Sequence, residues 1–276
     1  YVGWGDVHRC EFESELGSFC EHYGVGGKLG AIADWPAPRR YAPTEVAVPP
    51  FLPDNVHVRA DLAAMYTAWT RLDAGVGAML RELEVAGVAE STLIFFFSDN
   101  AIPFPAAKTN LLNHGQHVPL LISSPTQVTR GRRSSQVVSA LDLLPTMLQW
   151  AGLAYPASAR AGGRQSTLTG ASLLPLLDAN AEAWKGTAFG SHQFHSLYAY
   201  YPSRSLVDGD HLLVHNLAPN LRFPILEDVE ETSLWKAIEA TSAAGNATGW
   251  VYDLQSYMHR PEWQLFDVAA GPLGLH

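Results

Sequence analysis

One short run of residues limits the folds open to this chain more than any other feature. Residues 92–97 read Thr-Leu-Ile-Phe-Phe-Phe, an apolar run without polar alternation. Such a run is typical of a strand buried on both faces of a parallel sheet. Before it, apolar residues recur every three or four positions from Leu62 to Leu83, between a capping Asp-Asn pair at 54–55 and a terminating Gly87. Helix, short loop and buried strand together predict one step of an α/β layer.

The following residues extend this layer. Residues 118–123 form a second apolar run and predict another strand of the same sheet. Residues 142–150 then predict a second helix, with Asp142 as the cap and Gly152 as the stop. We therefore expect an α/β fold whose central sheet is rich in parallel strands and carries helices on both faces.

The pattern of apolar and turn-forming residues changes near residue 155. An Asp-Gly turn lies between two apolar runs within residues 206–214, which is the pattern of a β-hairpin. Residues 263–267 predict a further strand. We therefore predict two regions, an α/β part over 1–155 and a smaller antiparallel part over 156–276.

Composition excludes several classes of protein. Of 276 residues, 47% are hydrophobic and only 16% are charged, which excludes disorder as the main state. The 18 basic and 27 acidic side chains give a net charge of −9, which argues against a nucleic-acid binder. No apolar window is long enough for a membrane span. The chain opens on Tyr1-Val2, which we interpret as part of a strand, and we expect a fragment of a longer protein.

Candidate site residues follow the predicted strands. Asp99 and Asn100 come directly after the apolar run, where ligands bind in parallel sheets, and their oxygens suit Ca²⁺ or Mg²⁺. Lys108, nine positions past Asp99, could fold back onto a bound oxyanion. His8 follows the apparent first strand and is a candidate for anion binding or proton transfer. The ordinary alternatives are a turn after a strand for the Asp-Asn pair and a surface histidine for His8.

Two further features concern the cellular compartment. Cys10 and Cys20 are the two cysteines of the chain, and they form either a small-loop disulfide or two buried thiols. Asn246-Ala247-Thr248 is an acceptor triplet for N-glycosylation. A disulfide and a glycan would both indicate the secretory pathway.

The order and spacing of several motifs resemble the sulfatases over nearly the whole chain, up to about Asp267. The most specific segment is Ile102-Pro103-Phe104-Pro105 with Thr109-Asn110-Leu111. The other matching segments are 6–10 with Cys20, 59–64, 98–100, 119–125, 201–205, 213–217, 248–250 and 263–267.

The resemblance implies an alkaline-phosphatase-like fold and a set of roles. Asp99 and Asn100 would be ligands of an active-site Ca²⁺, and His8 and Lys108 would bind the sulfate group, with His8 also serving in proton transfer. His195 would approach the sugar, and Cys10 would pair with Cys20. The implied activity removes N-linked sulfate from a terminal glucosamine of a heparan-type glycosaminoglycan, in a lysosomal or secreted protein that is compatible with a homodimer.

The chain also departs from the family pattern. It contains no Cys-x-Pro-x-Arg, the motif whose cysteine becomes the formylglycine nucleophile, so we expect no turnover by this chain alone. Lys108 stands where the sulfatases generally have a basic residue, although the members that this chain most resembles have arginine there, and Ala101 replaces a common glycine. Two alternatives stay open, namely a sulfate ester, phosphoester or phosphonate hydrolase of the same superfamily, and a catalytically dead sugar-binding homologue.

Overall fold

The computed structural model describes residues 1–3, 7–9, 39–127, 130–156, 160–161, 164–165, 167–177, 184 and 186–270. Its helices are α1 (Val56–Val85), α2 (Asn113–Gln116), α3 (Leu143–Trp150), α4 (Leu174–Leu177), α5 (Glu227–Glu230), α6 (Ser233–Ala243) and α7 (Leu254–Met258). Short 3₁₀ turns cover Pro43–Glu45, Ala89–Ser91 and Ala140–Asp142. The strands are β1 (Ile94–Phe97), β2 (Leu120–Ser123), β3 (Arg160–Ala161), β4 (Arg164–Gln165), β5 (Thr187–Phe194), β6 (Tyr200–Asp208), β7 (His211–Asn216) and β8 (Trp263–Asp267).

Helix α1 forms where the apolar spacing predicts it. The Asn55 side chain accepts hydrogen bonds from the backbone N–H groups of His57 and Val58, which satisfies two donors that have no partner inside the helix. The predicted stripe is buried at Leu62 and Met65. Gly87 follows the helix with a φ of +69°, a conformation that favours glycine. The predicted helix is therefore confirmed, and so is the helix over 142–150, as α3.

Strands β1 and β2 pair with each other, but in the opposite sense to the one predicted. They are antiparallel, with Ile94 opposite Ser123 and Phe97 opposite Leu120. The chain between them folds into a compact loop with one short helix instead of the crossover helix that a parallel pair needs. Leu121 is 59% exposed, so burial on both faces is also wrong for this pair.

The second region contains the predicted antiparallel strands. Strands β5 to β8 form one sheet in the order of the sequence, and Gly209 turns the β6–β7 hairpin with a φ of +55°. Its inner face is buried at Leu212, Val214 and Phe266. The hairpin and the final strand are thus confirmed, whereas the boundary at residue 155 stays a prediction. Tyr1 and Val2 form no strand and are exposed, so that interpretation was wrong.

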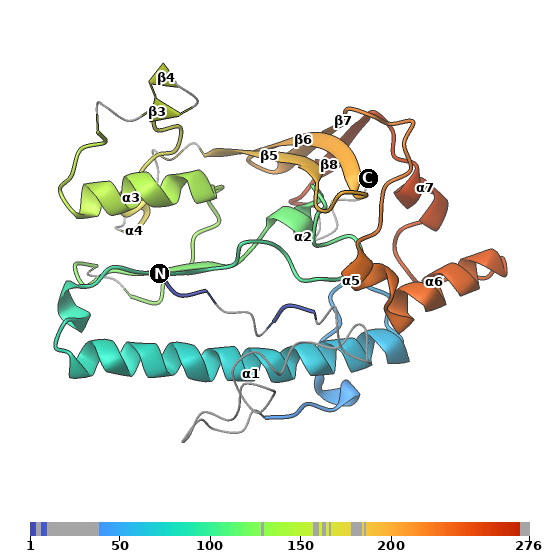
Figure 1. Ribbon diagram of the computed structural model, residues 1–276, viewed down its shortest axis with the longest axis horizontal. Helices are drawn as coiled ribbons and strands as arrows, with labels where there is room; N and C mark the ends of the chain where they lie inside the picture. The colour runs from blue at the N-terminus through green and yellow to red at the C-terminus, as the bar shows by residue number, and fades with distance from the viewer. Residues whose placement is uncertain are drawn as a thin grey trace.

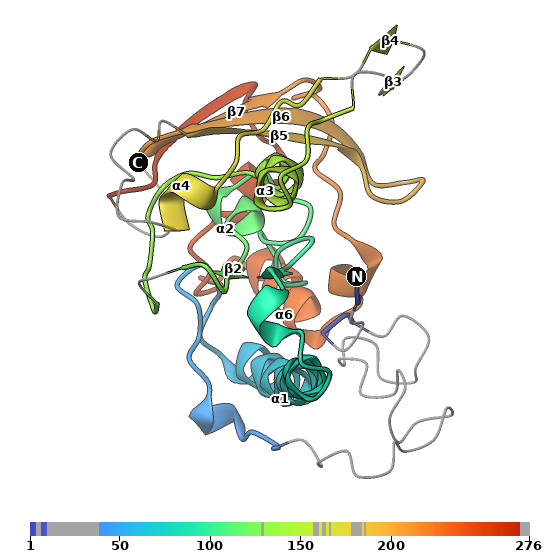
Figure 2. The ribbon, with the colours of Figure 1, turned by 90° about the vertical axis from the view of Figure 1, so that its left-hand side faces the viewer.

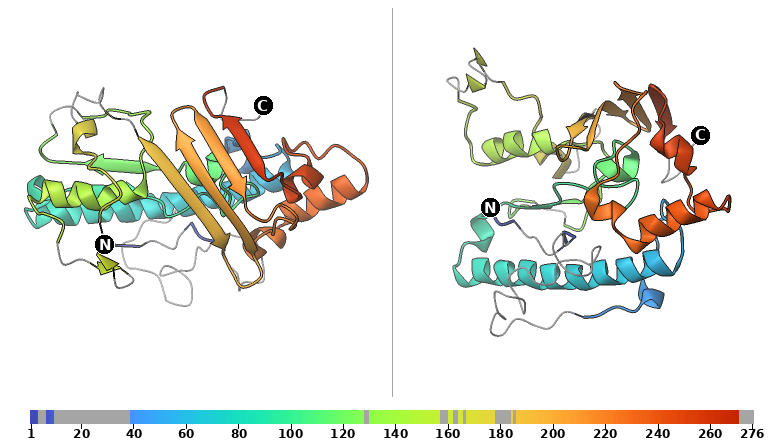
Figure 3. Two further views of the ribbon diagram at one scale, coloured as in Figure 1. Left: turned by 90° about the horizontal axis from the view of Figure 1, so that it is seen from above. Right: turned by 45° about the vertical axis from the view of Figure 1, so that its right-hand side comes forward.

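The elements form layers around a shared core. Helix α1 runs along one side, the β5–β8 sheet covers the other, and α2 and α5 lie between them (Figure 1). The end-on view in Figure 2 shows the same order from α1 up to the sheet, and Figure 3 shows the four strands from above. In the described part of the chain, no helix combines the length and the apolar character needed to cross a membrane.

Candidate functional site

The loop after β1 folds back on itself and brings the backbone of Lys108 into contact with Ile102. The backbone N–H of Lys108 donates to the carbonyl oxygen of Ile102 at 3.1 Å, so the chain returns to within two residues of Asn100. Ala106 and Thr109 flank Lys108 and have φ values of +66° and +65°. Each such left-handed non-glycine residue costs about 1–3 kcal/mol and persists only where its surroundings enforce it. The backbone therefore turns back at Lys108 and is strained on both sides of it, whereas the contact of Lys108 with an oxyanion stays a prediction.

A buried polar network holds this loop in place. The Asn110 side chain donates to the Lys108 carbonyl at 3.1 Å, and its Oδ1 accepts from Arg260 at 2.7 Å and from the Tyr257 hydroxyl at 3.2 Å. The same hydroxyl accepts from the backbone N–H of Ala106 at 3.2 Å. Arg260 also lies 3.4 Å from the centre of the Phe223 ring. Burial lowers the pKa of the Arg260 guanidinium, although arginine stays protonated in proteins. The network explains why the strained conformation around Lys108 is stable.

The segment that carries His8 is fastened to the same loop by its neighbour. The Arg9 side chain, only 1% exposed, donates to the carbonyl of Pro103 at 2.7 Å and to Asp61 of α1 at 2.7 Å. Its guanidinium also lies over the Phe104 ring. These contacts place His8 beside the loop, although about a hundred residues separate them in sequence.

His8, Lys108 and Asp228 form one cluster at this place. Lys108 Nζ lies 3.3 Å from His8 Nε2 and 2.9 Å from Asp228 Oδ2. The side chains of Lys108 and Asp228 are each only 4% exposed, whereas His8 is exposed. An ammonium group only donates and a carbonyl only accepts. His8 Nε2 must therefore accept from Lys108, and Nδ1–H must donate to the Arg9 carbonyl, 2.6 Å away. The contacts thus select the neutral Nδ1–H tautomer of His8.

Asp99 and Asn100 lie at the start of the same loop and are exposed. The Ser98 hydroxyl donates to the Asn100 carbonyl at 2.7 Å and shapes the turn. Their side-chain oxygens are the donor type that Ca²⁺ prefers, but Ca²⁺ takes six to eight ligands. Across the described ranges, no group of three or more His, Cys, Asp or Glu side chains could hold a metal. The donor chemistry fits a calcium ion, and the donor number is that of part of a site.

The remaining predicted residues lie in different places. His195 is exposed in the turn between β5 and β6. The same turn approaches α5, because the Tyr198 hydroxyl donates to Glu227 at 2.9 Å. Cys10 and Cys20 fall outside the described residues. Ala101 is buried in the core with an ordinary backbone conformation, so its methyl group is accommodated there.

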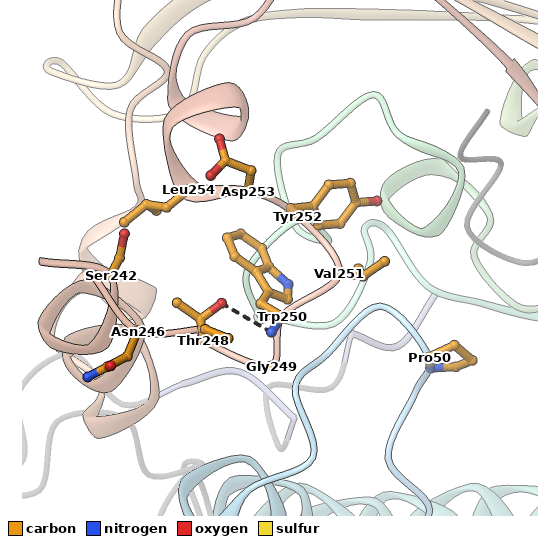
Figure 4. Close-up of a pocket in the computed structure, with 11 residues that line it drawn as sticks. Pro50, Ser242, Asn246, Thr248, Gly249, Trp250, Val251, Tyr252, Asp253 and Leu254 are labelled. Atoms are coloured by element: carbon orange, nitrogen blue, oxygen red, sulfur yellow. Dashed lines mark hydrogen bonds between the residues drawn. The ribbon is translucent and has the colours of Figure 1, made fainter. Parts of the chain in front are cut away.

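Asn246 borders a separate hollow of about 510 Å³ after α6. It is lined by Pro50, Ser242 and residues 246–254 (Figure 4). The Thr248 hydroxyl accepts from the Trp250 backbone there, and Asn246 itself is exposed, as a glycosylated asparagine must be. His8, Asp99, Lys108 and His195 do not line this hollow.

One histidine, His114 of α2, has a strongly shifted pKa. Burial, and to a lesser extent the nearby Arg260 charge, lower the pKa of His114 to about 4. The ring stacks on Phe51 with centroids 4.3 Å apart and contacts the Tyr252 hydroxyl at 3.1 Å. Burial also raises the pKa of the Tyr252 hydroxyl. His114 therefore belongs to the packing of the core as a neutral ring.

Sequence reasoning missed Asp228, Asn110 and Arg260 as parts of the site. Asp228 lies in the run Glu227-Asp228-Val229-Glu230-Glu231, which reads as a solvated acidic stretch. Its only local signal is its place between the buried residues Leu226 and Val229. The pairing with Lys108 spans 120 positions and becomes visible only in the fold.

Comparison with known proteins gives one consistent family. The family model "Sulfatase" matches residues 33–153. Human N-sulphoglucosamine sulphohydrolase is 44% identical over 99% of this chain and 54% of its own length. The ulvan-active sulfatase of Formosa agariphila is 33% identical over 40% of this chain and 18% of its own length. The chain thus spans about half the length of the human relative.

Solved structures agree on the fold. The Bacteroides fragilis protein yidJ superposes with a TM-score of 0.51 and 14% identity over 82% of this chain and 41% of its own. The structure of BT4656 with D-glucosamine-2-N,6-O-disulfate gives a TM-score of 0.50 and 18% identity over 79% of this chain and 36% of its own. At these identities the likeness concerns the fold alone, which is the alkaline-phosphatase-like fold expected from the sequence.

Proposed function

The chain belongs to the sulfatase family, and from this premise we propose that it serves a sulfohydrolase that removes N-linked sulfate from a terminal glucosamine of heparan-type glycosaminoglycan. One observation carries the proposal: 44% of its residues are identical to the human N-sulphoglucosamine sulphohydrolase, over 99% of the chain. The cluster of His8, Lys108 and Asp228 supports it, because it brings donors for an anion beside the loop of the proposed metal ligands.

Each proposed role follows from the chemistry of a side chain. Lys108 uses two of its three ammonium protons on Asp228 and His8, and it offers the third to a sulfate oxygen. His8 is exposed and can donate to the sulfate or move a proton. His195 lies in the turn beside α5 and is proposed to contact the sugar.

Asp99 and Asn100 are the proposed ligands of a calcium ion, together with donors beyond the described residues. When bound, the ion would withdraw electron density from the sulfate oxygens as a Lewis acid. The two side chains would fix the position of the ion next to the strained Lys108 loop.

The chain contributes binding and charge stabilisation rather than the attacking group. Its 276 residues contain no Cys-x-Pro-x-Arg motif. In the proposal, Lys108 and His8 stabilise the charge that develops on the sulfate oxygens, which is the main contribution of preorganised donors.

The cellular setting is part of the same proposal. We place the protein in the lysosome or the secreted pool, with a disulfide between Cys10 and Cys20, a glycan on Asn246 and a homodimeric state. The exposed acceptor triplet at Asn246 supports the secretory part of this setting.

The proposal is tested by titrating the chain with calcium and then with glucosamine N-sulfate in a calorimeter. We expect calcium to bind, the sugar to bind more tightly in its presence, and Asp99→Asn to remove the calcium effect. Asp73→Asn is the matched control, because Asp73 is an exposed carboxylate on α1 and its loss changes the net charge equally. Equal calcium affinity in the wild type and Asp99→Asn would remove the metal assignment, and no sugar binding would remove the substrate assignment.

A further inference from the structure

The cluster around Lys108 carries no net charge as it stands. Lys108 contributes one positive charge, Asp228 one negative charge, and His8 is neutral in the Nδ1–H tautomer that its contacts select. A pocket for sulfate needs positive charge, because burying an anion without compensation is costly. The cluster therefore needs one more proton, or one carboxylate fewer, before it favours an anion.

Asp228 is an unusual partner for a purely structural ion pair. Its side chain is 4% exposed, and its Oδ1 is buried without a hydrogen-bond partner within the described part of the chain. Leaving a buried acceptor unsatisfied costs about 1–3 kcal/mol, so such groups call for an explanation beyond stability. Here Asp228 Oδ2 accepts a hydrogen bond from Lys108, and the carboxylate offsets the positive charge of Lys108.

The charged groups near His8 decide whether it can take up this proton. Among the residues that the structure describes, the charged groups in the contacts of this segment are Lys108 of the loop, Asp228 of α5, and Arg9 with Asp61 of α1 as one of its partners. Of these groups, Lys108 contacts His8 directly and Asp228 contacts Lys108, so these two act on the charge of His8 at closest range. A sulfate beside Lys108 would place negative charge near Nε2 and favour its protonation, which turns this atom from an acceptor into a donor.

We propose that Asp228 is a positioning residue that couples anion binding at Lys108 to the uptake of one proton by His8. The inference rests on the proposed function and deepens it, because it states which protonation state of the site binds sulfate. The proton comes from the solvent and stays on His8 Nε2, where it donates to the bound anion. Removing the carboxylate charge at position 228 leaves Lys108 uncompensated, so the site no longer needs the proton.

The experiment titrates inorganic sulfate into the chain in two buffers of different ionisation enthalpy, which gives the number of protons taken up. For the wild type we expect close to one proton per sulfate at about pH 8, and an affinity that falls as the pH rises further, because binding consumes a proton. For Asp228→Asn we expect almost no proton uptake and at least about tenfold tighter sulfate binding at that pH. Glu230→Gln, an exposed acid on the same helix, is the matched control and should behave as the wild type.

Several results would overturn the inference: no sulfate binding by the wild type, binding without proton uptake, or unchanged uptake in Asp228→Asn. Long-range ¹H–¹⁵N spectra of the histidine side chains test it even if that variant fails to fold. The ligand-free wild type must show His8 as the Nδ1–H tautomer, and sulfate must shift it to the doubly protonated ring. If sulfate binds with proton uptake but glucosamine N-sulfate does not bind, the proposed function fails and the coupling stands.

Discussion

Gly115 of α2 is the residue at which the structure makes its most quantitative prediction. A Cβ atom added there would lie 2.2 Å from the Asn110 carbonyl oxygen and 2.7 Å from that of Ala107. Both are backbone atoms on either side of Lys108, so they cannot rotate away as a side chain could. Overpacking of this kind costs about 1–3 kcal/mol, and the clash here reaches the upper part of that range. Replacing a helical glycine by alanine returns about 0.5–1 kcal/mol. Gly115→Ala should therefore lose roughly 2 kcal/mol of unfolding free energy.

Gly77 of α1 provides a matched control for the same substitution. Its added Cβ would meet only the Arg81 guanidinium, at 3.5 Å, which is an ordinary contact. Gly77→Ala should therefore gain about 0.5–1 kcal/mol from helix propensity alone. Urea unfolding followed by linear extrapolation measures both variants, and with a slope of about 2–3 kcal/mol per molar the Gly115→Ala midpoint should fall by roughly 1 M. If Gly115→Ala is as stable as Gly77→Ala, the close approach of α2 to the Lys108 loop is refuted.

Three further predictions concern the core and the surface. The pKa of His114 is lowered to about 4 from an ordinary 6.5, so the unfolded chain binds its proton first as the pH falls. The free energy of unfolding should fall by up to roughly 3 kcal/mol between about pH 6.5 and pH 4. When urea midpoints are measured across this pH range, those of His114→Gln should fall less than those of the wild type. Equal decreases in the two proteins would contradict this. Asn110→Ala removes three hydrogen bonds, one of them from the buried Arg260, and should cost roughly 3 kcal/mol in thermal unfolding, whereas Asn100→Ala at the exposed turn should stay within about 0.5 kcal/mol. Asn246→Gln should remove one glycan from protein made in a secretory host, which an endoglycosidase shift on a gel detects; an unchanged mass would exclude that site.

The sequence was sufficient for elements whose signals are local. The cap at Asn55, the buried start of the apolar stripe of α1 and the turn at Gly209 are all set by residues within a few positions of each other. Each lies where it was predicted, with Asn55 as one of two candidate caps, whereas the later stripe residues Met79 and Leu80 are exposed. The direction of β1 against β2 was not, because an apolar run of four to six residues carries no information about the partner strand. That information lies in the compact loop between them, whose shape depends on contacts with Tyr257 and Arg260 from the far end of the chain.

The candidate site likewise combines residues with a local sequence signal and residues without one. Asp99, Asn100, Lys108 and His8 could be singled out because each follows a predicted strand or matches a family motif. Asp228 could not, because an acidic residue in an acidic run looks solvated until the fold buries it against Lys108. The buried network around Asn110 was invisible for the same reason. Residues that act on a site from distant positions leave no periodic or spacing signal.

The central claim is that His8 and Asp99, on segments far apart in sequence, serve one ligand. Titrating glucosamine N-sulfate into the calcium-loaded chain tests it most directly, with the wild type compared to His8→Gln and Asp99→Asn. Both positions are exposed, so neither substitution opens the core. Binding that weakens at least about tenfold in each variant is the predicted result, equal to about 1.4 kcal/mol. Wild-type affinity in either variant would contradict the claim.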